Sequence, residues 1–129
     1  MILLLDTSTA ECRLSLYEGT TLLLANVWQA DRELAEGLLG YILQNAAVQN
    51  KTLDDISGIG LMQGLGSFTG LRIGASICNA IAADRSIPIV GTTGEDWQAQ
   101  ALTRLNNGEN DQIVLPDYGR PARITQPRK

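Results

Sequence analysis

A glycine-rich stretch in the middle of the chain constrains its fold more than any other feature of the sequence. It runs from Gln63 to Gly74, reads Gln-Gly-Leu-Gly-Ser-Phe-Thr-Gly-Leu-Arg-Ile-Gly, and contains four glycines. An apolar segment, residues 56–62, precedes it, and a run of small and apolar residues follows it. Glycine permits sharp turns and close backbone contacts, and the hydroxyls of Ser67 and Thr69 can cap a helix. The pattern therefore predicts a strand, a glycine loop and a helix in succession.

The residues alone leave two interpretations of this loop open. Backbone N–H groups that converge in front of a helix can bind an anion. Alternatively, the glycines serve only to let the strand and the helix pack closely. The spacing matches neither a Walker A loop, since no lysine follows the last glycine, nor a strict dinucleotide fingerprint. The candidate residues for contact with a ligand or partner are Asp6, Thr7, Gly64, Gly66, Ser67, Thr69, Gly70 and Arg72.

Arg72 is unusual in this set because it lies at the start of an apolar helix. The helix dipole does not favour a cation at that end. We therefore expect a carboxylate, loop carbonyl groups or a bound anion to compensate its charge. The prediction is that Arg72 matters for loop geometry or assembly rather than for chemistry, and that its removal costs about 1–3 kcal/mol.

Hydrophobic periodicity assigns the other elements. Asp31 is expected to N-cap the first helix, and Thr92 or Thr93 the third. Residues 113–115 are a candidate short edge strand, and residues 116–129 are expected to be extended or flexible. The expected strands are residues 2–5, 11–17, 21–28, 56–62 and 87–91, and the expected helices are residues 32–48, 71–83 and 93–105.

This order of elements predicts an α/β fold that resembles a single ribonuclease-H-like lobe of the actin, Hsp70 and sugar-kinase superfamily. The sheet would be mixed and five-stranded, with helices on its faces. With 44% hydrophobic residues, the chain can bury a core of its own. We expect residues 1–105 to form the lobe and residues 106–129 to hold a turn, the edge strand and a basic, proline-containing tail.

Three segments carry a resemblance to a known family. The glycine loop, residues 64–74, resembles the signature of the TsaB family, also called YeaZ. These are bacterial partner proteins in making the threonylcarbamoyladenosine modification of tRNA. Residues 4–10 and 87–93 also resemble that family, so the similarity covers residues 1 to about 101. Leu65 stands where the family usually has proline. The family normally has two lobes, and the single lobe expected here argues against an intact two-lobed nucleotide cleft.

The resemblance implies a non-catalytic activator of a TsaD-like enzyme that transfers a threonylcarbamoyl group to tRNA. It implies homodimers in isolation and heterodimers with the catalytic subunit, formed through the first two helices of each partner. It allows a TsaE-like ATPase as a further partner, and tRNA contact only indirectly or through the basic tail. The residues expected at the helical interface are Ala35, Leu38, Ile42, Gly74, Ala75, Cys78 and Ala82.

The sequence contains no histidine, which excludes histidine-based acid–base catalysis, histidine triads and histidine-ligated zinc. Leu34 stands where proteins related to this family commonly have a histidine, so we expect neither a metal site nor a cofactor. Asp6 either faces a phosphate or metal, as in the wider superfamily, or closes the next turn through its side chain. We favour the turn, and we find no catalytic constellation.

Two other classes of function stay open. One is a degenerate nucleotide- or phosphate-binding protein of the actin-like ATPase superfamily, which calorimetry with ATP and ADP would detect. The other is a stand-alone binding module without a role in tRNA modification.

Charge is distributed unevenly along the chain, whose net charge is −4. The last twelve residues carry four bases and no acid, which leaves residues 1–117 with six bases, 14 acids and a net charge of −8. An acidic body is unsuited to bind RNA, whereas the tail could contact RNA, contact an acidic partner or be merely solvated. The tail bases are Arg120, Arg123, Arg128 and Lys129.

The sequence also predicts a cytoplasmic protein without membrane contact. No apolar run approaches the ~20 residues of a membrane helix, and no basic region precedes the apolar start of the chain. Cys12 and Cys78 are therefore expected to be reduced and buried.

Overall fold

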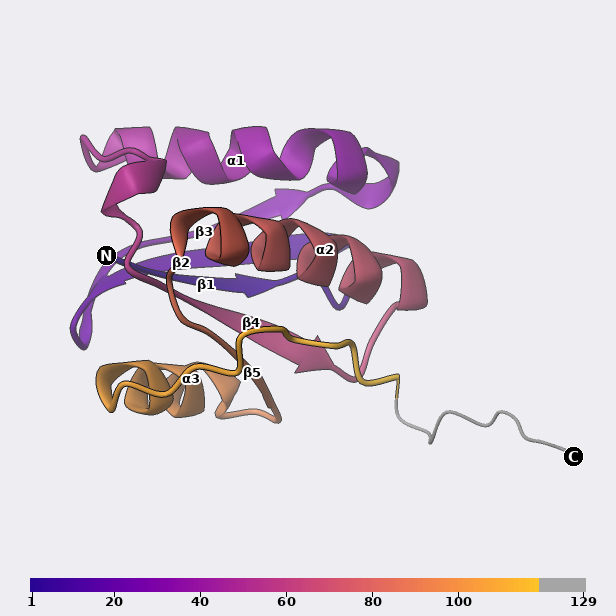
Figure 1. Cartoon of the computed structure of the whole chain (residues 1–129). Coiled ribbons are helices and arrows are strands. Elements are labelled where there is room, and N and C mark those ends of the chain that lie inside the picture. Colours follow the sequence, from indigo (N-terminus) through magenta and orange to yellow (C-terminus); the bar gives the residue numbers. More distant parts are fainter. Residues whose placement is uncertain (119–129) are drawn as a thin grey trace, which may run out of the picture.

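The computed structural model describes residues 1–118 and contains a mixed five-stranded sheet in the order β3-β2-β1-β4-β5 (Figure 1). β2 pairs antiparallel with both β1 and β3, whereas β4 pairs parallel with both β1 and β5. This arrangement confirms the predicted α/β class. The strands are β1 (Ile2–Asp6), β2 (Glu11–Glu18), β3 (Thr21–Gln29), β4 (Gly58–Gly64) and β5 (Ile89–Thr93).

Helices cover both faces of the sheet (Figure 1). α1 and α2 lie on one face, and α3 packs on the other. Two short 3-10 helices, η1 and η2, flank α1 in the sequence. The bounds are η1 (Asp31–Glu33), α1 (Leu34–Val48), η2 (Leu53–Asp55), α2 (Phe68–Arg85) and α3 (Trp97–Asn106).

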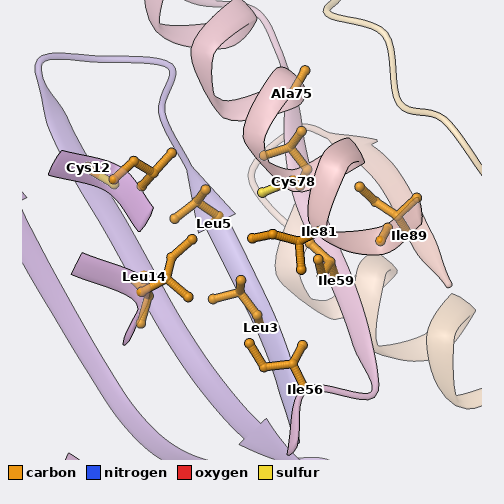
Figure 2. Close-up of a cluster of buried hydrophobic side chains, with 14 of the residues drawn as sticks. Leu3, Leu5, Cys12, Leu14, Ile56, Ile59, Ala75, Cys78, Ile81 and Ile89 are labelled. Atoms are coloured by element: carbon orange, nitrogen blue, oxygen red, sulfur yellow. The ribbon is translucent and has the colours of Figure 1, made fainter. Parts of the chain in front are cut away.

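The alternating side chains of β1 divide the core into two parts, because successive residues of a strand point to opposite faces. Leu3 and Leu5 point toward α1 and α2, and Figure 2 shows them in one cluster with Cys78 and Ile81 of α2. Ile2 and Leu4 pack on the other face with α3. An uninterrupted apolar strand is thus explained by helices on both sides of it. The smaller cluster comprises Ile2, Leu4, Val90, Trp97, Ala101 and Leu105.

Two predicted helix caps are wrong. Asp31 lies inside η1, which Ala30 caps without a side-chain hydrogen bond. The cap residue of α3 is Asp96, because β5 continues to Thr93 and the helix begins only at Trp97. The buried hydroxyl of Thr92 instead donates a 2.8 Å hydrogen bond to the carbonyl oxygen of Trp97.

The chain after α3 returns along the β5 edge of the sheet, and we call residues 109–118 the strap. Residues 113–115 are irregular, so the short edge strand predicted there is not formed. Side-chain oxygens instead accept hydrogen bonds from the backbone N–H groups at this edge. The N–H of Ile89 donates to Oδ1 of Asn110 (3.1 Å), and the N–H of Gly91 donates to Oδ2 of Asp111 (2.9 Å). Short polar side chains of this kind can replace strand carbonyls as acceptors.

Two amides fix the rest of the strap. The Asn79 side chain of α2 both donates to and accepts from the backbone of Val114, at 2.9 Å each. The side chain of Gln63 donates to the carbonyl oxygen of Leu115 (2.8 Å). The backbone oxygen of Gln63 accepts a hydrogen bond from the N–H of Asp117 (2.7 Å). The predicted tail from residue 119 onward, with its four bases, lies outside the described residues. No helix within residues 1–118 is long and apolar enough to cross a membrane.

Candidate partner-binding face and glycine loop

The glycine loop and the turn after β1 hold each other in place. Ser67, one of the two hydroxyl residues expected to cap this helix, caps α2 by accepting a hydrogen bond from the N–H of Gly70 (3.3 Å). The N–H of Ser67 donates to the carbonyl oxygen of Ser8 (2.8 Å). The buried hydroxyl of Thr7 donates to the carbonyl oxygen of Gly70 (2.7 Å). Two N–H groups that could have faced an anion are therefore used within the chain.

Three glycines of the loop are required by this close approach. A Cβ atom on Gly66 would lie 2.5 Å from the carbonyl oxygen of Ser8. A Cβ on Gly70 would collide with the carbonyl oxygen of Thr7, and one on Gly74 with the side chain of Thr7. These contacts favour the second interpretation of the loop, in which its glycines allow a helix to lie directly against β1. Gly64 also lies against the chain, where a Cβ would meet the backbone of Asp117 in the strap.

Asp6 closes the turn through its side chain. Its Oδ1 accepts hydrogen bonds from the N–H of Ser8 (2.8 Å) and from the hydroxyl of Ser8 (2.5 Å). This is the side-chain-to-backbone pattern of an Asx turn. The geometry agrees with the turn interpretation of Asp6 rather than with a role toward phosphate or metal.

Arg72 is exposed, and the group that lies beside its positive charge is an aromatic ring. Its guanidinium carbon lies 5.5 Å from the centre of the Phe68 ring, within the range of a cation–π contact. The Phe68 ring lies in turn 4.6 Å from that of Tyr118 in the strap. Within residues 1–118, Arg72 forms no ion pair. Among the described residues, an aromatic ring rather than a carboxylate therefore lies beside this guanidinium.

The residues predicted at the helical interface belong, with one exception, to the core of the chain itself. Ala35 is exposed, whereas the other six are buried. Ala75 is only 4% exposed, although it contributes to the lining of the groove described below. The apolar periodicity of α1 and α2 is thus mostly explained by packing on the sheet. The six buried residues are Leu38, Ile42, Gly74, Ala75, Cys78 and Ala82.

The exposed sides of α1 and α2 nevertheless form an apolar face, which the periodicity did not resolve. Leu39 and Leu43 on α1 are 44% and 42% exposed. An open groove of about 780 Å³ runs along α2, with Ala35 of α1 on one side and strap residues Leu115 and Tyr118 on the other. The groove also contains Arg72, Ile73, Ser76 and Ile77 of α2.

Both cysteines of the chain are buried. Burial raises the pKa of Cys12 and of Cys78 to about 12, and the nearby Asp6 carboxylate adds to this effect at Cys12. Both thiols are therefore protonated and unreactive at neutral pH. Within residues 1–118, no three histidine, cysteine or acidic side chains gather into a potential metal site. Leu34 packs in the core.

A cluster of charged side chains lies at the base of the strap. Arg104 of α3 bonds to Glu109 (2.7 Å) and forms an ion pair with Asp111. Hydrogen bonds from Arg104, and then from the N–H of Gly91, hold the pKa of the Asp111 carboxyl below its usual value, although partial desolvation opposes this. The pair orients Asp111 toward the edge of β5, which is a structural role.

Comparison with known proteins places this lobe in a family. The sequence model of the family described as "TsaD: tRNA N6-adenosine threonylcarbamoyltransferase" matches residues 28–115. The tRNA threonylcarbamoyladenosine biosynthesis protein TsaB of Escherichia coli K12 is 30% identical over 105 residues, which are 81% of this chain and 45% of that protein. TsaB of Haemophilus influenzae is 31% identical over 110 residues, 84% of this chain and 46% of that protein. The chain thus spans about half the length of the curated relatives it matches.

Solved structures agree with these matches. YeaZ from Pseudomonas aeruginosa superposes with a TM-score of 0.67 at 25% identity, over 82% of this chain and 49% of that one. Thermus thermophilus RuvC superposes with a TM-score of 0.54 at 12% identity, over 94% of this chain and 83% of that one, and shows a common fold alone. The resemblance to TsaB and YeaZ is thereby confirmed, and the chain belongs to the family of the tRNA N6-adenosine threonylcarbamoyltransferase TsaD.

Proposed function

We propose that this chain is a non-catalytic component in making the threonylcarbamoyladenosine modification of tRNA, and that it holds and activates a TsaD-like catalytic subunit in the cytoplasm. Its matched relatives are named for that biosynthesis. The observation that carries the proposal is the exposed apolar face of α1 and α2.

This face lacks charge over an unusual length. α1 has no charged residue from Gly37 to its end at Val48, and α2 has none from Ile73 to Ala83. Helices on the surface of a monomer normally carry charged residues on their outer side. An uncharged outer side with exposed leucines, here Leu39 and Leu43, is typical of a protein interface. The groove between α1, α2 and the strap can receive an apolar helix of the partner.

The absence of a catalytic role is supported by the chemistry of the described residues. The chain has no histidine. Its two thiols are buried, and the carboxylate of Asp6 is bound to Ser8. The alternative of a phosphate-binding lobe is less well supported, because the N–H groups of Ser67 and Gly70 already have partners.

The test is the affinity for a TsaD-like subunit, measured by calorimetry. Leu43→Asp places a charge in the apolar face and should weaken binding at least about tenfold, since an unpaired buried charge is costly. Thr103→Asp is the matched control, because Thr103 is exposed on α3, on the other face of the sheet. Equal affinities of both variants would contradict the proposal.

Activity provides a second measurement. The wild-type chain should raise threonylcarbamoyl transfer by the TsaD-like subunit, and Leu43→Asp should not. Titration of the chain alone with ATP and ADP distinguishes the alternative function, since saturable heat of binding would support a nucleotide site. A contact between the basic tail and tRNA would appear as weaker tRNA binding when the four tail bases are replaced. A TsaE-like ATPase would appear as a requirement for that protein in the same assay.

A further inference from the structure

Among the residues of 1–118 that line the groove between α1, α2 and the strap, Arg72 is the one that carries a charge. The others are apolar or neutral, such as Ile73 and Ile77 of α2 and Leu115 of the strap. An apolar groove binds a helix through shape and apolar area, which leave the direction and register of that helix weakly determined. A charge within such a surface supplies this information, because electrostatic complementarity fixes register and suppresses wrong partners.

The charge of Arg72 has no acid beside it in the described part of the chain. Within residues 1–118 its guanidinium forms no ion pair. Its guanidinium carbon lies 5.5 Å from the centre of the Phe68 ring. A ring attracts the charge but offers no oxygen, so this contact leaves the N–H donors of the guanidinium available. The side chain can therefore bind a carboxylate without losing its aromatic contact.

The fold positions this guanidinium from two separate segments. Phe68 lies in the first turn of α2, and the ring of Tyr118 in the strap lies 4.6 Å from it, centre to centre. The strap is in turn bound to β4 through the side chain of Gln63 and to α2 through that of Asn79. A side chain supported by fixed neighbours loses less freedom when a partner binds.

We propose that Arg72 binds a carboxylate of the helix that docks in the groove, and that this ion pair fixes the direction of the helix. The inference rests on the proposed function, in which that helix belongs to a TsaD-like subunit. The planar guanidinium matches a carboxylate with paired N–H donors. The acid of the partner then lies near the N-terminus of α2, where the positive end of the helix dipole also favours a negative charge.

The charge of the chain makes this contact selective. Its net charge is −4, so most of its surface repels a carboxylate. A helix docked in the reverse direction places its acid near Ile77 and Asn79, where the described groove has no cation. A desolvated carboxylate without a partner is costly, and a base placed beside Arg72 is repelled. The single cation thus discriminates between directions as well as between helices.

The first test is calorimetric binding of a TsaD-like subunit to charge variants of the chain. Arg72→Glu should weaken binding at least about tenfold more than Arg13→Glu, which changes the net charge equally. Arg13 is a matched control because it is exposed on β2, on the face of the sheet opposite α1 and α2. Melting temperatures check that both variants are folded. Equal affinities of the two variants overturn the proposal.

The second test restores the pair with its charges exchanged. Each acidic residue on the exposed helices of the TsaD-like subunit is replaced in turn by lysine, and its binding to Arg72→Glu is measured. One replacement should return the affinity to within about threefold of the wild-type pair, and the same replacement should weaken binding to the wild-type chain. Failure of every replacement to restore the affinity overturns the proposal.

Other outcomes separate this inference from the proposed function. If Leu43→Asp weakens binding of the subunit and Arg72→Glu has no more effect than Arg13→Glu, the helical face remains the interface and only the ion pair is wrong. If the wild-type chain does not bind the subunit, both are wrong. If Arg72→Glu weakens binding of tRNA to the chain alone and leaves the affinity for the subunit unchanged, the anion is a phosphate, and the carboxylate is overturned.

Discussion

The hydroxyl of Thr7 donates a 2.7 Å hydrogen bond to the carbonyl oxygen of Gly70, and both residues are buried. This bond joins the turn after β1 to the first turn of α2. The same turn is joined to the loop by the bond from Ser67 to Ser8. The two segments therefore form one rigid unit, and its stability should respond to small changes on either side.

Thr7→Val keeps the shape of the side chain and removes its donor. We expect a loss of about 1 kcal/mol in the free energy of unfolding, the usual contribution of a buried hydrogen bond. Urea denaturation would measure it. Thr9→Val is the control, because the Thr9 hydroxyl bonds to Glu11 in an exposed position, where water can replace the partner. A similar loss in both variants would show that the Thr7 bond is of no special importance.

A pair of glycine substitutions tests the close approach of α2. Gly74→Ala should destabilise the fold by about 1–3 kcal/mol, because its Cβ would collide with the Thr7 side chain. Gly40→Ala should stabilise it by about 0.5–1 kcal/mol, since Gly40 lies inside α1 and a Cβ there meets no atom within 4 Å. Thermal denaturation of the two variants beside the wild type should give shifts of opposite sign.

Removing the Arg72 side chain should lower the free energy of unfolding by less than the sequence alone predicts. An exposed cation–π contact is worth about 0.5–1 kcal/mol, rather than the ~1–3 kcal/mol expected for stranding a buried partner. Arg72→Ala should lower the melting temperature only slightly, and Arg72→Lys should retain part of the contact with Phe68. A loss above about 2 kcal/mol would indicate a stronger interaction than the aromatic one described.

The ion pair between Arg104 and Asp111 should make stability depend on pH in the acid range. The pKa of Asp111 is lower in the folded state than in the unfolded state. Its contribution is therefore complete above the unfolded pKa, about 4, and is lost as the pH falls through the folded value. Asp111→Asn should lower stability at pH 7 and reduce the loss between about pH 5 and 2.

Asp84→Asn is the control for that experiment, because Asp84 is highly exposed on α2. It should leave the pH profile close to that of the wild type. Melting temperatures across the same pH range would compare the three proteins. Parallel profiles for the wild type and Asp111→Asn would contradict the assigned role of this carboxyl.

The sequence was sufficient for the strands and helices because their apolar patterns are local. The uninterrupted apolar run of β1 and the alternation in β2 placed both strands within a residue of their bounds. Of the two hydroxyls offered as caps of α2, Ser67 forms the cap and Thr69 lies inside the helix. Asp31, and Thr92 or Thr93, do not cap the helices expected of them. A residue suited to capping forms a cap only if the helix begins beside it, and tertiary packing decides where the helix begins.

The candidate site could be predicted only in part, for two physical reasons. An apolar stripe on a helix has the same periodicity whether it packs on its own sheet or on a partner, so the sequence did not show that residues such as Leu38 and Ile42 are buried within the chain. The neighbours of Arg72 come from distant positions: the ring of Tyr118, which stacks on Phe68, belongs to the strap. No local pattern indicates that contact.

The strap has a practical consequence for dividing the chain into fragments. A fragment ending at Leu105, the predicted end of the lobe, would lose the acceptors that Asn110 and Asp111 provide to Ile89 and Gly91. It would leave Arg104 without its carboxylates and uncover the β5 edge of the sheet. Such a fragment should precipitate or be digested by proteases more readily than one ending at residue 118. The shortest soluble form of this lobe is therefore set by the segment that closes its sheet, not by its last helix.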